Sequence, residues 1–395
     1  MEVKKKYELT NETIEFNGIT LHRIKALKDF SDVKAGDLGG WIEKEENLSQ
    51  IDDAWIGGNA KVFGDAQVYG NAEVYENAII YGNAVIFGNA KVFGDAQVYD
   101  YAQVFCDAEV YGNAQVYGNA EVYENAIIYG NAVIFGNANV YGNAKVYGHA
   151  IVEGNAEICG NAVVCGNVLI CGDAEVYGNA WAFGNAKIHG NAVICCYAQV
   201  CGNAEICGDA QVYGYAEVFG GAQVYGNAEV YDNVRICGDA IVCGNARVFG
   251  DAQVYDCAII HGNAAIYENA HICEHTIVRD CARIYGVSKI YGNTIVSDNA
   301  KVFENAEVCG NAEVFGNAEI CGDAVVKNNE DYIVFKNFWS SGRYFTWTRS
   351  NNMFKVGCFY GTGKELIEKA YKDSERSGKE YKKIVRYADS ILADE

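Results

Sequence analysis

The chain repeats apolar and polar positions with a period of six residues from Ile51 to Val326. The repeated unit is A-x-V-y-G-N, and its aliphatic position is Val or Ile in 45 of 46 consecutive units, the exception being Ala182. The position two residues earlier is Ala in 41 of the 46 units, and no insertion or deletion interrupts the register. A fixed short period of this kind predicts a repeat architecture in which every unit is one structural step.

Inside each unit, the Ala and Val/Ile positions alternate with variable ones as in a β-strand, and the following Gly-Asn or Gly-Asp predicts a tight corner. Such a short strand buries little surface alone, so the units are expected to coil and stack in parallel. Because only small and aliphatic side chains point inward, we expect three hexads per coil and about 15 coils, roughly 70 Å long at the usual strand spacing.

The two ends of the chain differ in composition from this region, which predicts three parts: an N-terminal capping segment (1–50), the hexapeptide-repeat β-helix (51–326) and a C-terminal α+β module (327–395). Their net charges are −2, −22 and +3, so the repeat region holds the acidity of a chain whose net charge is −21. The first segment is expected to form a hairpin at residues 16–19. Four of its apolar residues are expected to cover the first coil: Leu38, Trp41, Ile42 and Leu48.

The last 69 residues begin with the strand-like sequences YIVFKNF and YFTWTRSNNMFKVGCFY and end in two apolar-faced helical patterns. Thr362 with Glu365, and Ser377 with Glu380, have the spacing of helix capping boxes. We therefore expect a small α+β module that caps the second end of the β-helix, because an uncovered end would expose strand edges.

The opening KYELTNETIEF, the segments LHRIKALKDF and VKAGDLGGWIEKEENLSQ, and the repeats GNAKVFGDAQVYGNA resemble the hexapeptide-repeat proteins, most closely the YdcK-like proteins and related phage- and prophage-encoded repeat proteins. The resemblance covers essentially the whole chain. It implies a single-stranded left-handed parallel β-helix. The left hand rests on the resemblance alone, because the general crossover rule for parallel strands would suggest the opposite hand. It also implies acyltransferase activity as an alternative function, and an origin in a phage, a prophage or a bacterium.

The acyltransferases of this superfamily commonly use a His as general base in a walled cleft. The chain has six His residues, and none is accompanied by a loop insertion that would build such a wall: His22, His149, His189, His261, His271 and His275. We therefore assign no catalytic residue, and acyl transfer is the alternative interpretation.

The cysteines are expected to be reduced thiols. Eleven of the 16 occupy the outward y position, and no two of these eleven are 18 residues apart. Cysteines two coils apart would be separated by roughly 10 Å, which is beyond disulfide reach. The row Cys171, His189, Cys207 could offer metal ligands, but no fourth ligand is apparent. We expect no metal and no cofactor.

Rows of Tyr and Phe at the y position are expected to stack on each other along the faces of the β-helix.

The acidity of the repeat region is compatible with a DNA-mimicking inhibitor, which is the second alternative. The negative charge of the repeats disfavours their direct binding of nucleic acid. No run of 18 apolar residues exists and the first residues are charged. These features predict no membrane segment and a cytoplasmic location.

The favoured hypothesis is a non-enzymatic structural or interaction protein, an acidic β-helical scaffold or spacer. Its partner is expected to be a protein, bound through the C-terminal module or the repeat surface, and an oligomer is compatible with the sequence. The basic and aromatic C-terminal module is the expected place of recognition. The candidate binding residues there are Trp339, Arg343, Trp347, Arg349, Asn351, Asn352 and Lys355.

Overall fold

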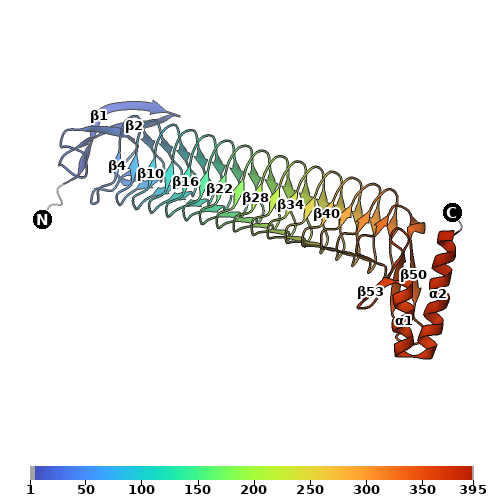
Figure 1. Ribbon diagram of the computed structural model, residues 1–395. Coiled ribbons are helices and arrows are strands. Elements are labelled where there is room, and N and C mark those ends of the chain that lie inside the picture. Colours follow the sequence, from blue (N-terminus) through green and yellow to red (C-terminus); the bar gives the residue numbers. More distant parts are fainter. Residues whose placement is uncertain (1–4, 394–395) are drawn as a thin grey trace. The chain divides into compact units, whose positions relative to one another are not determined.

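The computed structural model describes residues 5–393, which divide into two compact units at Gly208 and Asp209. Each unit contains a stack of parallel coils (Figure 1). The coils are made of two-residue strands that recur every six residues, from β4 (Trp55–Ile56) to β49 (Val325–Val326). The fold is therefore a parallel β-solenoid of about 16 turns, which confirms the architecture predicted from the hexad pattern.

Successive coils pair at intervals of three hexads. In the first unit, β5 (Lys61–Val62) pairs in parallel with β8 (Ile79–Ile80), and the Lys61 N–H donates to the Ala78 carbonyl at 2.9 Å. In the second unit, β36 (Arg247–Val248) pairs in the same way with β39 (Ala265–Ile266). The Ala and Val/Ile side chains form the interior and are fully buried, because every coil covers those of its neighbours.

The corners require a left-handed backbone, which glycine adopts without strain. Twelve solenoid residues other than glycine have positive φ, and ten of them are Asp or Glu. Eight of these ten carboxylates accept a hydrogen bond from the backbone N–H one coil later, as Glu76 does from Gly94 at 2.8 Å and Glu304 does from Gly322 at 2.7 Å. These acidic residues therefore hold neighbouring corners together.

Side-chain ladders connect the coils on the outside. In the first unit, the Asn119 amide donates to Asn137 at 3.0 Å, and Asn137 donates to Asn155 at 2.9 Å. The rings of Tyr81 and Tyr99 stack with centroids 4.7 Å apart and planes 6° from parallel, which confirms the predicted aromatic stacking. All 16 cysteines are free thiols, as the spacing argument predicts.

The N-terminal segment adds structure to the first coils. β1 (Tyr7–Phe16) and β2 (Ile19–Ala26) form the predicted hairpin, and β3 (Leu38–Ile42) pairs antiparallel with β2 and parallel with β5. A short 3-10 helix, η1 (Glu45–Asn47), follows. Ile42 and Leu48 pair with Val62 and Val68, so they extend the interior columns by part of a turn. The prediction was wrong for Leu38, which is 52% exposed instead of covering the coil.

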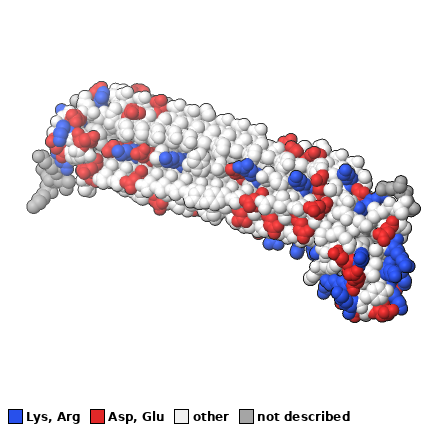
Figure 2. Space-filling view, viewed as in Figure 1, with Lys and Arg blue, Asp and Glu red and all other residues white. Residues whose placement is uncertain are grey.

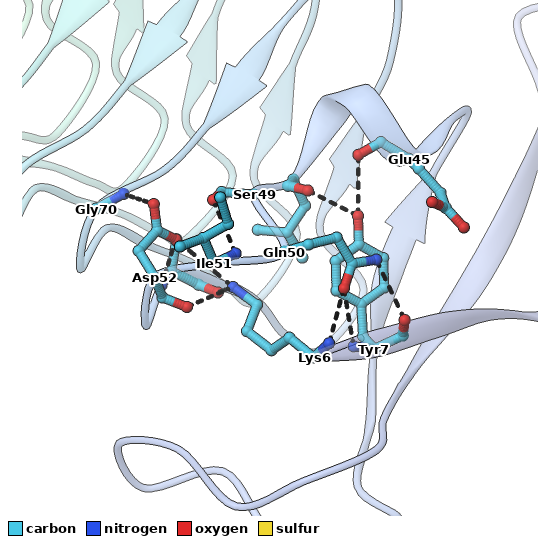
Figure 3. Close-up of polar contacts among 10 residues, drawn as sticks. Lys6, Tyr7, Glu45, Ser49, Gln50, Ile51, Asp52 and Gly70 are labelled. Atoms are coloured by element: carbon cyan, nitrogen blue, oxygen red, sulfur yellow. Dashed lines mark hydrogen bonds and ion pairs between the residues drawn. The ribbon is translucent and has the colours of Figure 1, made fainter. Parts of the chain in front are cut away.

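A buried polar network fixes the chain before the first hexad (Figure 3). The Lys6 ammonium group donates to the carbonyls of Ala54 at 2.7 Å and Asp52 at 2.9 Å. The Tyr7 hydroxyl donates to the Leu48 carbonyl at 2.7 Å, and the Gln50 side chain bonds the backbone of Tyr7. These bonds satisfy carbonyl groups where the chain departs from the six-residue register.

The C-terminal module contains a four-stranded antiparallel sheet and two helices. After η2 (Asn329–Asp331), the strands are β50 (Tyr332–Lys336), β51 (Tyr344–Thr348), β52 (Met353–Val356) and β53 (Phe359–Thr362). The helices are α1 (Gly363–Asp373) and α2 (Glu375–Ala393). No helix in residues 5–393 has the length and apolar character needed to cross a bilayer.

The two predicted capping boxes had different outcomes. Thr362 caps α1 and forms the capping box with Glu365, as predicted. The prediction for α2 was wrong, because this helix begins at Glu375, before Ser377. The Ser374 hydroxyl accepts the Ser377 N–H at 3.1 Å and so provides the N-terminal cap.

Candidate binding groove beside the C-terminal sheet

A groove of about 520 Å³ lies between the last coils and the C-terminal sheet. Two large rings on its wall are unusually exposed for apolar groups, Phe315 at 51% and Tyr344 at 45%. Strand β50 provides three further lining residues, which give the groove an apolar wall. The complete lining is Phe315, Gly316, Asn317, Asn329, Tyr332, Ile333, Val334 and Tyr344.

The groove lies where the column of coils ends. Phe315 occupies a y position, but the residue 18 positions later is Ile333, which belongs to β50 rather than to a further coil. Tyr332 joins the two parts, since its hydroxyl donates to the Glu313 carbonyl at 2.9 Å and accepts the Phe315 N–H at 3.3 Å. Burial raises the pKa of Tyr332, so this hydroxyl keeps its proton for that bond.

Strand β50 is also an edge strand. Within the described residues the sheet has the order β50-β51-β52-β53, so β50 pairs with β51 on one side only. Ile333 and Val334 of this strand line the groove. An exposed sheet edge beside apolar pockets is the geometry that accepts an extended peptide as an added strand.

The rim of the groove carries two basic side chains, Arg343 and Lys336. Arg343 is exposed and lines, together with Glu319, a second hollow of about 340 Å³ that shares Asn317 and Tyr344 with the first. The Lys336 ammonium group lies 5.4 Å from the centre of the Tyr344 ring, within cation–π range. Figure 2 shows many Lys and Arg side chains on the C-terminal module. This rim favours an acidic ligand.

The two tryptophans predicted as binding residues lie in the core of the module. Trp347 is fully buried, and its indole N–H donates to the Asn352 side chain at 2.8 Å. Trp339 is 7% exposed and packs edge-on against Tyr381, with ring centroids 4.9 Å apart. Both rings stabilise the packing of the sheet against the helices, and the structure does not bring them to the groove.

The remaining predicted residues mostly hold the module together. Asn351 accepts from the Thr348 hydroxyl at 2.6 Å and donates to the Tyr360 hydroxyl at 3.1 Å. The Arg349 N–H donates to the carbonyl of Asp331 at 2.8 Å. The Lys355 ammonium group lies 5.4 Å from the centre of the Phe303 ring.

Arg343 is the one predicted binding residue beside the groove, in the hollow that adjoins it. Sequence reasoning missed Phe315, Tyr332 and Tyr344, which form the aromatic wall of the groove. A signal was present for Phe315, because it is the last aromatic y residue in its row of hexads and no ring follows it 18 residues later.

A second cluster lies on the first unit. The His189 Nε2 atom is 2.9 Å from a Glu205 carboxylate oxygen, and with Cys207 these residues place three potential metal-binding atoms within 4.8 Å of one another. Burial raises the pKa of the Cys207 thiol, which disfavours the thiolate that a metal would bind. This is the single group of potential metal-binding atoms found among the described residues. Cys171, which the sequence placed in the same row, is not part of it.

Comparison with known proteins identifies the repeats. Residues 66–82, 114–130, 222–238 and 240–256 match the family described as YdcK beta solenoid repeat. The protein named "Uncharacterized acetyltransferase YdcK" of Escherichia coli (strain K12) is 38% identical over 60 residues, which cover 13% of this chain and 18% of that protein. The chain thus aligns with less than one fifth of the length of this relative.

Proposed function

For this chain, a YdcK-like β-solenoid repeat protein, we propose a non-enzymatic role as an interaction scaffold that binds an extended, acidic segment of a protein partner in the C-terminal groove. The observation that carries this proposal is the edge strand β50 beside an apolar groove with a basic rim. The partner segment would pair with the edge of β50, place an apolar side chain against Phe315 and Tyr344, and place a carboxylate near Arg343.

The physical basis is the cost of exposing large rings. Apolar surface gains about 25 cal/mol for each Å² removed from water, so covering two half-exposed rings favours binding. The exposed Arg343 would add charge-assisted hydrogen bonds to a carboxylate. The fully buried Trp347 supports the sheet from behind, which keeps the groove formed before a ligand arrives.

A random peptide display library selected on the full chain tests this role. We expect enriched peptides that combine an aromatic or aliphatic residue with Asp or Glu. Their binding should fall with Tyr344→Ala and with Arg343→Glu. Tyr371→Ala is the matched control, because Tyr371 is a similarly exposed ring, at 39%, on α1 outside the groove. Selection of no peptide, or equal loss with the control, would refute the proposed groove.

Acetyl transfer is the second candidate function. A relative named as an acetyltransferase and the His189–Glu205 pair support it, since a carboxylate that holds a His ring is a common arrangement for a general base. The imidazole and carboxylate are each 37% exposed, which leaves the ring accessible to an acceptor.

This candidate has its own assay. Release of free thiol from acetyl-coenzyme A in the presence of amine and hydroxyl acceptors would reveal transfer, and His189→Gln should abolish it. His261→Gln is the control, because His261 occupies the same outward position in another coil. Activity that survives His189→Gln would exclude this residue as the base.

The third candidate, a DNA-mimicking inhibitor, has less support. Many corner carboxylates are used to bind backbone N–H groups, as Asp232 binds Gly250 at 3.1 Å and Glu268 binds Gly286 at 2.8 Å. These acidic residues therefore have a structural role that needs no DNA-binding partner. Competition between DNA and this chain for a bound protein would revive the candidate.

A further inference from the structure

An open notch on the second unit combines two arginines in an otherwise acidic repeat region. β36 (Arg247–Val248), β39 (Ala265–Ile266) and β42 (Arg283–Ile284) are consecutive strands of one face, so Arg247, Ala265 and Arg283 lie in register. A cavity of about 420 Å³ is centred on them. Its other lining residues are Phe249, Asn263, Tyr267 and Cys281.

The notch results from one small side chain. Ala265 is the single Ala at the outward x position among the 46 hexads. Strands two coils apart are separated by roughly 10 Å, so the two arginine side chains flank a space that a longer residue at position 265 would fill. This separation accommodates a small tetrahedral anion between two guanidinium groups.

Neither guanidinium group forms an ion pair among the described residues, although Glu229 lies in register with Arg247 on the preceding coil. Among the described residues, no carboxylate oxygen lies within 4.0 Å of a nitrogen of Arg247 or Arg283. Two nearby basic side chains at the x position are paired in this way: Arg235 with Glu217 at 3.0 Å, and Lys301 with Glu319 at 2.8 Å. The two notch arginines therefore keep their donors available.

Asn263 provides a further donor. Its side-chain oxygen accepts from Asn245 at 3.1 Å, which continues the asparagine ladder from the previous coil. The ladder would go on at position 281, but Cys281 stands there, so the Asn263 amide nitrogen has no Asn or Asp acceptor on the next coil. The rings of Phe249 and Tyr267 stack at 4.9 Å and form an apolar wall beside this donor.

We propose that this notch is a binding site for a phosphate-bearing small molecule. A phosphate dianion offers enough oxygens to bond guanidinium groups from both sides, whereas one carboxylate is satisfied by one bidentate arginine. The net charge of −21 disfavours long polyanions such as nucleic acid, and this selects a small ligand. Any ring on the ligand would contact the edge of Tyr267, because Phe249 and Tyr285 stack on the two faces of that ring.

Calorimetric titration of the full chain with inorganic phosphate, pyrophosphate and phenyl phosphate at constant ionic strength tests the site. We expect saturable binding of one anion per chain, weakened at least about tenfold when Arg247→Gln and Arg283→Gln are combined. Ala265→Gln should weaken binding by filling the notch while leaving the charge unchanged. Gln occurs at the same x position at 253, so this variant should fold.

Arg235→Gln is the matched control, since it removes an x-position arginine that already has a carboxylate partner. The proposal would be overturned if Arg235→Gln weakened binding as much as the combined Arg247→Gln and Arg283→Gln change. It would also be overturned if Ala265→Gln left binding undiminished, because charge alone would then explain the affinity. Tighter binding of phenyl phosphate than of inorganic phosphate would show that Tyr267 contacts a ring on the ligand. Equal binding of the two would show that the site recognises the phosphate group alone.

Discussion

Replacing Gly244 with alanine should weaken the contact between two coils. Gly244 has φ of +71°, and an added Cβ would lie 3.0 Å from the backbone nitrogen of Gly262 and 3.1 Å from its oxygen. Gly316 offers a matched position, because its φ is +68° but a Cβ there meets no atom within 4 Å. Both alanine variants carry the same backbone strain, and only Gly244→Ala adds a steric clash.

The magnitudes follow from these two terms. A left-handed alanine costs about 1–2 kcal/mol, which should be the whole effect of Gly316→Ala. The tight contact should add about 1–3 kcal/mol, so Gly244→Ala should cost roughly 2–5 kcal/mol. Gly244→Asp should recover about 1 kcal/mol, because its carboxylate can accept the Gly262 N–H as Asp232 accepts that of Gly250.

Urea unfolding followed by circular dichroism measures the free energy of unfolding, and amide hydrogen exchange of the segment around Gly262 locates the loosening. Equal losses for Gly244→Ala and Gly316→Ala would refute the steric part of the reasoning. A Gly244→Asp variant no more stable than Gly244→Ala would refute the role given to the corner carboxylates.

Three further predictions concern buried and stacked groups. Desolvation by burial lowers the pKa of Lys6 from 10.5 to about 8, so the unfolded chain binds the extra proton and stability should rise between about pH 8 and 10.5, by up to roughly 3 kcal/mol. The free energy of unfolding of Lys6→Met should lack this rise when it is plotted against pH. Plots with the same slope for Lys6→Met and for the unchanged chain would contradict the prediction. Ala182→Val should stabilise the first unit by roughly 1 kcal/mol in urea unfolding, because Ala182 lies between Val164 and Val200 in a column of Val and Ile side chains. A lower free energy of unfolding would mean that the neighbouring side chains already fill the space beside Ala182. Burial first, and then neighbouring tyrosines, raises the pKa of Tyr99 and of Tyr285 to about 12. Ionisation above pH 10 is therefore favoured in the unfolded chain, so stability should fall as pH rises from 10 towards 12, and ultraviolet titration of the folded protein should show fewer ionised tyrosines at pH 11 than after denaturation.

The coil could be predicted from the sequence because one short period fixes both the inward residues and the pairing interval. The corners were harder, because Glu76 or Glu304 in the sequence has the appearance of an ordinary solvent-facing charge. Their hydrogen bonds depend on the residue 18 positions later and on a left-handed backbone. The six-letter pattern specifies neither.

The C-terminal module has no repeat, and there composition was a poor guide to position. Trp347 and Arg343 lie in one short polar and aromatic stretch, yet Trp347 is fully buried and Arg343 is exposed in the hollow beside the groove. Trp347 lies within β51 and belongs to the core of the module, whereas Arg343 lies in the connection before that strand. The wall around Phe315 depends on contacts between distant segments, which local sequence cannot supply.

The identical hydrogen-bonding edge of every coil has a consequence for how the gene can change. The string GNAEVYENAIIYGNAVIFGNA occurs at residues 70–90 and again at 118–138, a displacement of 48 residues that is eight hexads but not a whole number of coils. Each copy therefore lies on different faces from its original, and the backbone pairs equally well in both places. Recombination in steps of six codons can thus lengthen, shorten or rotate the surface pattern while the interior stays intact, so the outward residues are free to diversify.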